Sequence, residues 1–163
     1  MKKVAMLIAR IPNPRTLKRI KALEECFLIY LLYWDRDLEV KEDFETSDKI
    51  RVKQILVKAP QGKPLKRIIP LIIFFGLAIN NLKLIKPEII HAENLDMLFI
   101  AIIYKKIFNR NTEIIYEVAD LPKYSFYKKS NSFRSLIAKG LQWLERKMTK
   151  NITISHYTQL GLN

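Results

Sequence analysis

Residues 4–14 read VAMLIARIPNP, and this stretch predicts a buried strand that leads into a helix. The continuous apolar run at 4–9 is typical of a strand that is covered on both faces of a sheet. Asn13 followed by Pro14 is the pattern of a helix that begins with an N-cap and a proline in its first turn. Strands of this kind occur in parallel sheets, so the start of the chain favours an α/β fold.

The same alternation of strand and helix continues along the chain. Further apolar runs predict strands at residues 27–34, 51–57, 88–92, 113–118 and 151–155. Helical spacing or long apolar runs predict helices at residues 65–85, 95–108 and 132–150. Polar residues and helix breakers predict loops at residues 35–48, 60–64 and 122–131. We therefore expect one Rossmann-like domain over residues 1–163, with a parallel sheet and helices on both faces.

In the first helix, Leu17, Ile20 and Leu23, with Phe27 beyond them, are spaced to form one apolar face. The charged residues that lie mostly on its other sides are Arg15, Lys18, Arg19 and Lys21. This pattern is typical of a helix that packs one side on a sheet and leaves the rest in water.

Composition excludes several classes of protein. The 163 residues are 49% hydrophobic, which is too apolar for a disordered basic tail and sufficient for one core. Net charge is +13, although residues 35–48 carry −5, so the remaining chain is strongly basic. The single cysteine, Cys26, excludes an intramolecular disulfide framework. Together with two histidines it supplies too few ligands for a structural zinc site, and we expect no metal.

Neither a leader nor a membrane span is expected. The first residues resemble the start of a signal peptide, but Arg10 interrupts the apolar run and no small-x-small cleavage pattern follows. The longest uncharged run, residues 68–82, includes Pro70 and Gly76 and falls short of the roughly 20 apolar residues that cross a bilayer.

The basic charge suggests two kinds of partner. One is an anionic membrane surface, bound by residues 65–85 and the bases around them. Those bases are Lys63, Lys66, Arg67, Lys83 and Lys86. The same segment also fits an ordinary core helix. Nucleic acid is the weaker partner, because no recognition motif accompanies the aromatic and basic residues.

Candidate functional residues follow the predicted strands, because ligands of open parallel sheets bind outside the carboxyl ends of the strands. They are Arg10, Asn13, Arg15, His91, Glu93, Asn94, Asp96, Glu117 and Asp120. His91 beside Glu93 suits contact with a hydroxyl or transfer of a proton, or else a buried histidine satisfied by backbone. Glu117 and Asp120 could form a carboxylate pair, or Asp120 could cap a helix. Arg10 and Arg15 suit a phosphate or carboxylate, or simply a charged surface.

Cofactor motifs are missing from the sequence. The first strand is not followed by Gly-x-Gly-x-x-Gly, and the chain has neither a Walker lysine loop nor a serine nucleophile elbow. We therefore expect no dinucleotide or other cofactor in this domain, and no catalytic residue can be assigned from a motif.

Several segments together resemble the first half of bacterial family 4 glycosyltransferases of the GT-B fold. The resemblance follows chain order through residues 13–15 (NPR), 31–36 (LLYWDR), 89–96 (IIHAENLD), 114–121 (IIYEVADL), 145–147 (ERK) and 152–155 (ITIS). Glu93 and Asn94 stand where such enzymes usually have a His-Asp pair, and Ala119 stands where many have a histidine. The glycine-rich first loop of many relatives is also missing.

The resemblance implies an amino-terminal, acceptor-binding domain without the carboxyl-terminal domain that binds a nucleotide-sugar donor. Its candidate residues would line the acceptor cleft, with Arg10 and Arg15 near acceptor phosphate. The acceptor would be a polysaccharide, a lipid-linked sugar or a similar molecule, at the cytoplasmic face of the plasma membrane in a bacterium. A separate chain could supply the donor domain, and this chain alone would have negligible activity. The alternative is a non-catalytic module that binds a membrane surface or a protein, as the remnant of a truncated glycosyltransferase gene.

Overall fold

A single parallel sheet organises the computed structural model, which describes residues 1–36, 47–59, 68–118, 140, 143, 146–149, 152 and 154–157. The strands of this sheet stand in the order β3-β2-β1-β4-β5-β6. Their bounds are β1 (Lys2–Ile8), β2 (Phe27–Asp35), β3 (Ile50–Leu56), β4 (Ile89–Glu93), β5 (Glu113–Val118) and β6 (Ile154–Tyr157). The labelled helices are α1 (Pro14–Leu23), α2 (Ile68–Ile85) and α3 (Asn94–Ile107). The Rossmann-like α/β fold expected from the sequence is confirmed.

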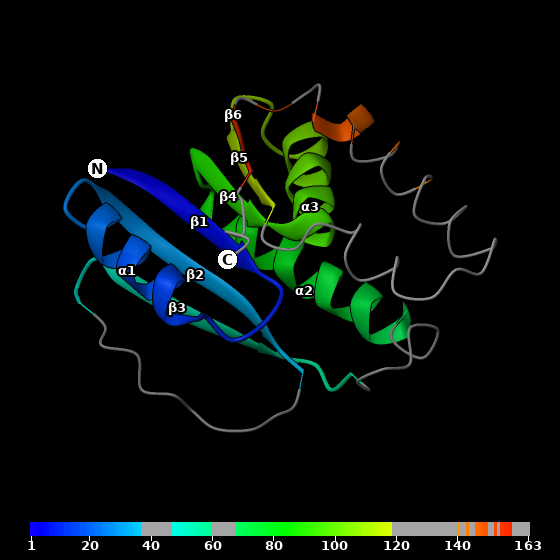
Figure 1. Cartoon of the computed structure of the whole chain (residues 1–163), viewed down its shortest axis with the longest axis horizontal. Helices are drawn as coiled ribbons and strands as arrows, with labels where there is room; N and C mark the ends of the chain where they lie inside the picture. Colours follow the sequence, from blue (N-terminus) through cyan, green and yellow to red (C-terminus); the bar gives the residue numbers. More distant parts are fainter. Residues whose placement is uncertain are drawn as a thin grey trace, which may run out of the picture.

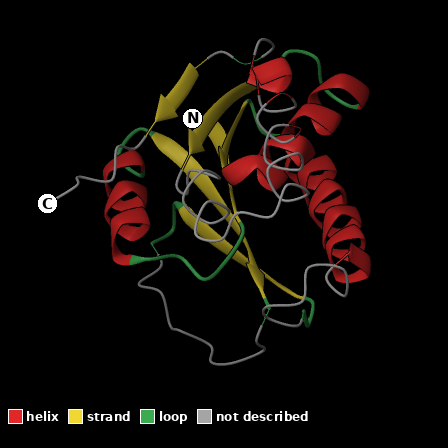
Figure 2. Ribbon diagram, turned by 45° about the vertical axis from the view of Figure 1, so that its right-hand side comes forward, coloured by secondary structure: helices red, strands yellow, loops and turns green. Residues whose placement is uncertain are grey.

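The strand order explains why the helices lie on two faces. The chain steps outward from β1 to β3, then returns to place β4 beside β1 and steps outward in the opposite direction. Right-handed crossovers therefore put α1 on one face, and α2 and α3 on the other. Figure 1 shows α1 over β1 and β2, and Figure 2 shows helices on both sides of the sheet.

Alternate residues of β1 supply the two cores. Val4, Met6 and Ile8 belong to the core beneath α1, together with Ile20 of that helix. The intervening residues of the strand belong to the core beneath α2 and α3, which is the larger one. Both faces of β1 are thus covered, which is why its sequence is apolar without a polar alternation.

Most predicted bounds agree with the structure to within a few residues. The strand at 113–118 matches β5, whereas β4 begins and ends one residue later than predicted and therefore includes Glu93. The last strand is shifted toward the carboxyl terminus, from 151–155 to Ile154–Tyr157. Of the helix predicted at 132–150, the described residues 140, 143 and 146–149 are helical. The predicted loops at 60–64 and 122–131 and most of 35–48 lie outside the described residues.

Helix α2 is long and apolar enough to cross a membrane by length and composition, which the sequence analysis did not expect. Pro70 is its third residue, where a missing backbone N–H costs no helical hydrogen bond. Phe74, Ala78 and Leu82 are fully buried against the sheet, and α2 connects β3 to β4 within one parallel sheet. In this fold α2 is therefore a surface helix of the domain, with most of its length exposed.

Candidate functional site

Three polar side chains lie together at the carboxyl edge of the sheet, on the face that α1 covers. Glu93 is the last residue of β4, and Glu117 is its register partner in β5. His91 precedes Glu93 by two residues, so alternation along the strand places both side chains on one face. Met6, the register partner of His91 in β1, belongs to the core beneath α1 and identifies that face. All three side chains belong to residues more than nine-tenths buried, so each needs a polar partner.

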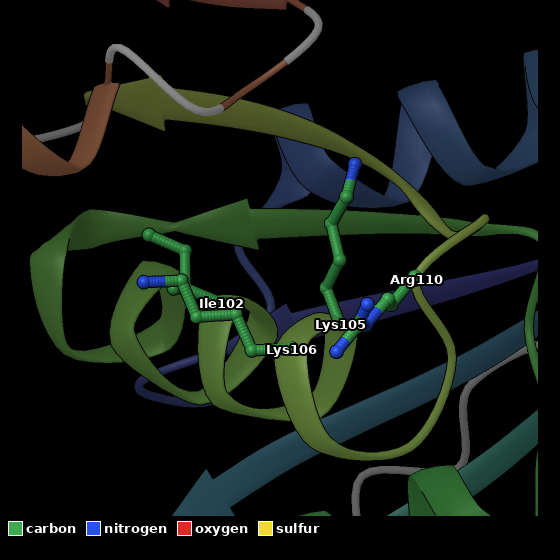
Figure 3. A pocket seen from close by; sticks show the side chains of 4 residues that line it. All are labelled: Ile102, Lys105, Lys106 and Arg110. Atoms are coloured by element: carbon green, nitrogen blue, oxygen red, sulfur yellow. The ribbon is translucent and has the colours of Figure 1, made fainter.

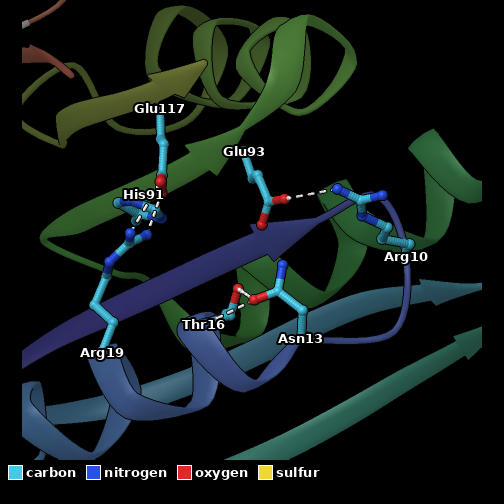
Figure 4. Close-up of polar contacts among 7 residues, drawn as sticks. All are labelled: Arg10, Asn13, Thr16, Arg19, His91, Glu93 and Glu117. Carbon is cyan, nitrogen blue, oxygen red and sulfur yellow. Dashed lines mark hydrogen bonds and ion pairs between the residues drawn. The ribbon is translucent and has the colours of Figure 1, made fainter. Parts of the chain in front are cut away.

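Arg19 of α1 supplies a partner for Glu117 (Figure 4). Both terminal nitrogens of its guanidinium group donate to the carboxylate, Nη1 to Oε2 and Nη2 to Oε1, the latter at 2.9 Å. The planar guanidinium suits this two-point contact, which fixes the carboxylate in orientation as well as in charge. Helix α1 is thereby tied to a strand that lies two positions across the sheet from β1.

His91 contacts the same carboxylate with one of its ring nitrogens. Nε2 lies 3.3 Å from Oε2 of Glu117, so a hydrogen on Nε2 satisfies the contact. Nδ1 is buried and has no hydrogen-bond partner among the described residues. In the neutral ring with hydrogen on Nε2, Nδ1 is an acceptor. The site therefore holds an imidazole whose buried Nδ1 has no partner among the described residues.

The two carboxyl groups of the site differ in charge preference. The hydrogen bond from His91 lowers the pKa of Glu117 well below its ordinary value, against the opposing effect of burial and with further help from Arg19. Burial raises the pKa of Glu93, and the neighbouring charge of Glu117 raises it further. Environments that move two pKa values apart are typical of paired acid and base groups. The surroundings of Glu117 thus favour its anion, whereas burial and the charge of Glu117 disfavour the anion of Glu93.

Arg10, in the loop after β1, partly compensates the burial of Glu93. Its Nη2 lies 4.0 Å from Oε1 of Glu93, at the limit of an ion pair, and its side chain is half exposed. This contact lowers the pKa of Glu93, but less than burial and Glu117 raise it. Arg10 therefore stands between the buried cluster and solvent, where it could also contact an anionic ligand.

The other candidate residues from the sequence lie at several different positions in the structure. Asn13 caps α1, because its Oδ1 accepts hydrogen bonds from the backbone nitrogen of Thr16 at 2.9 Å and from Thr16 Oγ1 at 3.2 Å. Arg15 lies exposed in the first turn of α1. Asn94 and Asp96 lie in the first turn of α3. Asn94 has a positive φ of 74°. Oδ1 of Asp96 accepts a hydrogen bond from the backbone nitrogen of Met97 at 3.1 Å. Asp120 lies outside the described residues, so the predicted pair with Glu117 has no geometry; the carboxyl beside Glu117 in the sheet is Glu93.

Arg19 is the member of the cluster that the sequence analysis did not include. Helical spacing places it beside the apolar face of α1, and its 98-residue separation from Glu117 leaves no local signal of the contact. The expected alternative for His91, satisfaction by backbone, also differs from the structure, since its partner is a carboxylate. Among the described residues, no group of three or more His, Cys, Asp or Glu could hold a metal ion.

Comparisons with known proteins show similarity in fold alone. No protein-family model matches the sequence, and no curated protein matches it either. The chain is similar to the structure of sucrose-phosphate synthase from Thermosynechococcus elongatus, with a TM-score of 0.60 and 12% identity, over 100% of this chain and 49% of that one. This chain therefore spans about half the length of that enzyme.

Two further structures are similar to smaller degrees. One is a wide-type short-chain dehydrogenase/reductase from Veillonella parvula in complex with NADP, with a TM-score of 0.50 and 11% identity, over 94% of this chain and 67% of that one. The other is a putative UDP-N-acetylglucosamine 2-epimerase from Listeria monocytogenes, with a TM-score of 0.49 and 16% identity, over 96% and 39%. At these identities, the comparison with sucrose-phosphate synthase supports a Rossmann-like, GT-B-like fold and establishes nothing finer.

Proposed function

We propose that this domain is the acceptor-binding half of a glycosyltransferase and that its cluster at the carboxyl edge binds a sugar hydroxyl. The fold is similar to about half of sucrose-phosphate synthase, and the ordered motifs of the sequence resemble the first domain of GT-B glycosyltransferases. The observation that carries the proposal is the unused Nδ1 of His91, a buried acceptor beside two carboxyl groups. In this proposal the side chains that cover this nitrogen move aside when the acceptor binds, and a hydroxyl group of the acceptor then donates to it.

The cluster has the arrangement of a general base with an orienting group. Arg19 holds the Glu117 carboxylate, which in turn holds Nε2 of His91 and directs the imidazole. In the transfer, the hydroxyl oxygen of the acceptor forms a bond with the anomeric carbon of the donor sugar, and the bond from that carbon to the nucleotide phosphate breaks. The hydroxyl proton moves to Nδ1 of His91, and the nucleoside diphosphate leaves with the electron pair.

In this proposal, this half supplies only the acceptor side of the reaction. A departing diphosphate needs positive charge or hydrogen-bond donors directed at it. We assign that task, and the nucleotide sugar itself, to a donor domain on the same or a separate chain. The 163-residue chain alone is therefore expected to bind an acceptor and to transfer no sugar. Robust transfer by the purified chain from a nucleotide sugar to any acceptor would contradict this division of roles.

The two histidines of the chain make the binding step directly testable. Histidine labelled with ¹⁵N gives separate ring signals for His91 and His156, which the variant His91→Phe assigns. The probes are methyl glycosides of glucose, galactose, mannose and N-acetylglucosamine, together with farnesyl phosphate. At least one glycoside is expected to shift the Nδ1 signal of His91 and to leave the His156 signals in place.

Two comparisons decide the outcome of this titration. His91→Phe is expected to abolish binding of the glycoside that shifts His91, whereas Lys18→Met, an exposed change on α1, leaves its affinity unchanged. If no probe shifts His91, or if His91→Phe binds a glycoside as the parent does, the acceptor role of the cluster is wrong. The chain would then be better described as a non-catalytic module.

A further inference from the structure

The outer side of α2 is an apolar surface of unusual extent for a helix in contact with water. Ile69 is 70% exposed and Ile72 is 65% exposed. Three neighbours on the same side have exposures from 42% to 51%. The exposed apolar residues between positions 68 and 77, called here the α2 outer face, are Ile68, Ile69, Ile72, Ile73 and Leu77. Apolar groups gathered in one continuous stripe mark an interaction site far more often than the same groups scattered singly.

The apolar surface continues from α2 onto α3. Phe75 of α2 contacts Phe99 of α3, with ring centroids 5.7 Å apart, and Phe99 is 44% exposed. At the end of α3, its last residue Ile107 and the following Phe108 are also exposed. The two helices therefore present one layer of exposed apolar side chains, on the side of the sheet opposite to His91 and the two carboxyl groups.

Positive charge borders this layer at its other end. Lys83 of α2 lies over the ring of Phe108, 5.1 Å from its centroid. Lys105, Lys106 and Arg110 line a pocket of about 470 Å³ with Ile102 at the carboxyl end of α3 (Figure 3). Helix α2 contains no acidic residue, and α3 contains Asp96 alone. The charges that these two helices themselves contribute at this end are thus all positive, which is complementary to an anionic surface.

We propose that the α2 outer face and the basic ends of α2 and α3 dock on the surface of an anionic lipid bilayer. The face offers apolar side chains without polar groups to fix the register of a partner, whereas protein interfaces carry about one hydrogen bond per 100–200 Å². Apolar side chains bordered by lysines are instead the pattern of helices that lie in the bilayer interface.

The helix lies on the bilayer in this arrangement and does not cross it. Phe74, Ala78 and Leu82 remain packed on the sheet, so only the outward side chains enter the lipid. The sequence places three further bases, Lys63, Lys66 and Arg67, just before the apolar end of α2. Docking of this kind depends both on buried apolar area and on attraction to anionic headgroups.

Co-sedimentation of the 163-residue chain with lipid vesicles tests the docking. Vesicles that mix phosphatidylcholine with phosphatidylglycerol are expected to bind the chain about tenfold or more tightly than phosphatidylcholine alone, with binding that weakens as salt rises. The double variant I69S/I72S and the double variant K83E/K106E are each expected to lower binding by about tenfold. The matched controls are L56S and K53E, which change exposed residues on β3 and should leave binding unchanged.

A local probe locates the contact on the molecule. Cys26 is the single cysteine and is exposed, so C26S provides a background for one introduced thiol. An environment-sensitive dye on I72C is expected to shift its emission to the blue with anionic vesicles, and the same dye on L56C is not. Circular dichroism confirms that each variant is folded before binding is compared.

Each contrary result has a distinct meaning. Absence of binding to anionic vesicles at low salt, or equal binding by I69S/I72S and the parent, overturns the proposal. A dimer in sedimentation velocity that I69S/I72S abolishes, without vesicle binding, assigns the α2 outer face to a second copy of the chain. The vesicle assay is independent of the glycoside titration, since the face and the His91 cluster lie on opposite sides of the sheet.

Discussion

Substitution of Arg19 by methionine tests the charge network that holds the candidate site. The change keeps most of the aliphatic length of the side chain and removes both hydrogen bonds to Glu117. Loss of one partner from a buried ion pair costs about 3–5 kcal/mol, because the remaining charge stays buried. The Arg19 side chain is 29% exposed and the His91 contact survives, so water and imidazole offset part of this loss. We expect a decrease of about 2 kcal/mol in the free energy of unfolding.

Urea denaturation followed by circular dichroism measures this decrease. With a slope of about 2 kcal/mol per molar urea, typical of a domain of this size, the midpoint should fall by about 1 M. Lys18→Met is the matched control, since Lys18 is the exposed neighbour on the same helix and should shift the midpoint little. The double variant R19M/E117Q should lose less stability than the sum of the two single variants, because the carboxylate and the guanidinium act on each other.

The difference between parent and R19M should also depend on pH. The pKa of Glu117 is lowered in the folded chain, so its ionised form adds stability above its ordinary value of 4.5. That contribution is lost as pH falls below 4.5, and Arg19 supplies part of it. The two unfolding free energies should therefore converge in acid. A midpoint for R19M equal to that of K18M at neutral pH would refute the role of Arg19 in the network.

Three further predictions concern single positions and use the same denaturation assay. Asn13→Ala removes the cap of α1 and should cost about 1 kcal/mol, whereas Asn13→Asp should cost little; equal losses would exclude the side-chain cap. Glu93→Gln should raise the urea midpoint at neutral pH, because burial and Glu117 raise the pKa of Glu93, so the ionised carboxylate of Glu93 opposes folding. The increase should vanish in acid, and a lower midpoint at neutral pH would contradict this explanation. Trp34→Phe removes the 2.8 Å hydrogen bond from Nε1 to the carbonyl of Val57 and some buried packing, and it should cost at least about 1–2 kcal/mol; an unchanged midpoint would contradict this.

Periodicity in the sequence was sufficient to predict the fold because the sheet is covered on both faces. Residues 4–9 read as a continuous apolar run since alternate side chains of β1 enter two different cores. The bounds of β5 also agree with the sequence prediction, and its Ile114 and Tyr116 enter the larger core. The cap formed by Asn13 was predictable for a different reason, as its partner Thr16 lies three residues away. Local chemistry of this kind can be read from neighbouring residues without tertiary information.

The composition of the candidate site was only partly predictable. His91, Glu93 and Glu117 were named because parallel strands end at one edge of a sheet. Their mutual contacts depend on register, and a shift of one residue in β4 decides that Glu93 belongs to the strand and faces the same side as His91. Arg19 could not be found, because a long flexible side chain crosses between elements that are distant in the sequence.

The exposure of α2 could not be predicted from the sequence either. An apolar segment of 18 residues fits a core helix, a membrane span or a surface helix, and hydropathy does not distinguish them. The distinction comes from the sheet, which is wide enough to bury Phe74, Ala78 and Leu82 and leaves the remaining sides of the helix uncovered. In this chain, tertiary contacts decide which polar residues contact one another and which apolar residues remain exposed.

The two proposals share one edge of the molecule. Helix α2 follows β3, so its apolar first turns begin at the carboxyl edge of the sheet, where β4 and β5 also end in Glu93 and Val118. A bilayer on the outer side of α2 would therefore reach the edge that carries the His91 cluster, on the opposite face of the sheet, as well as the basic ends of α2 and α3 at the other edge. An acceptor with a sugar headgroup and a lipid tail suits that arrangement. If soluble glycosides bind His91 and vesicles bind α2, a lipid-linked glycoside should bind more tightly than either part alone, because one contact raises the effective concentration for the other.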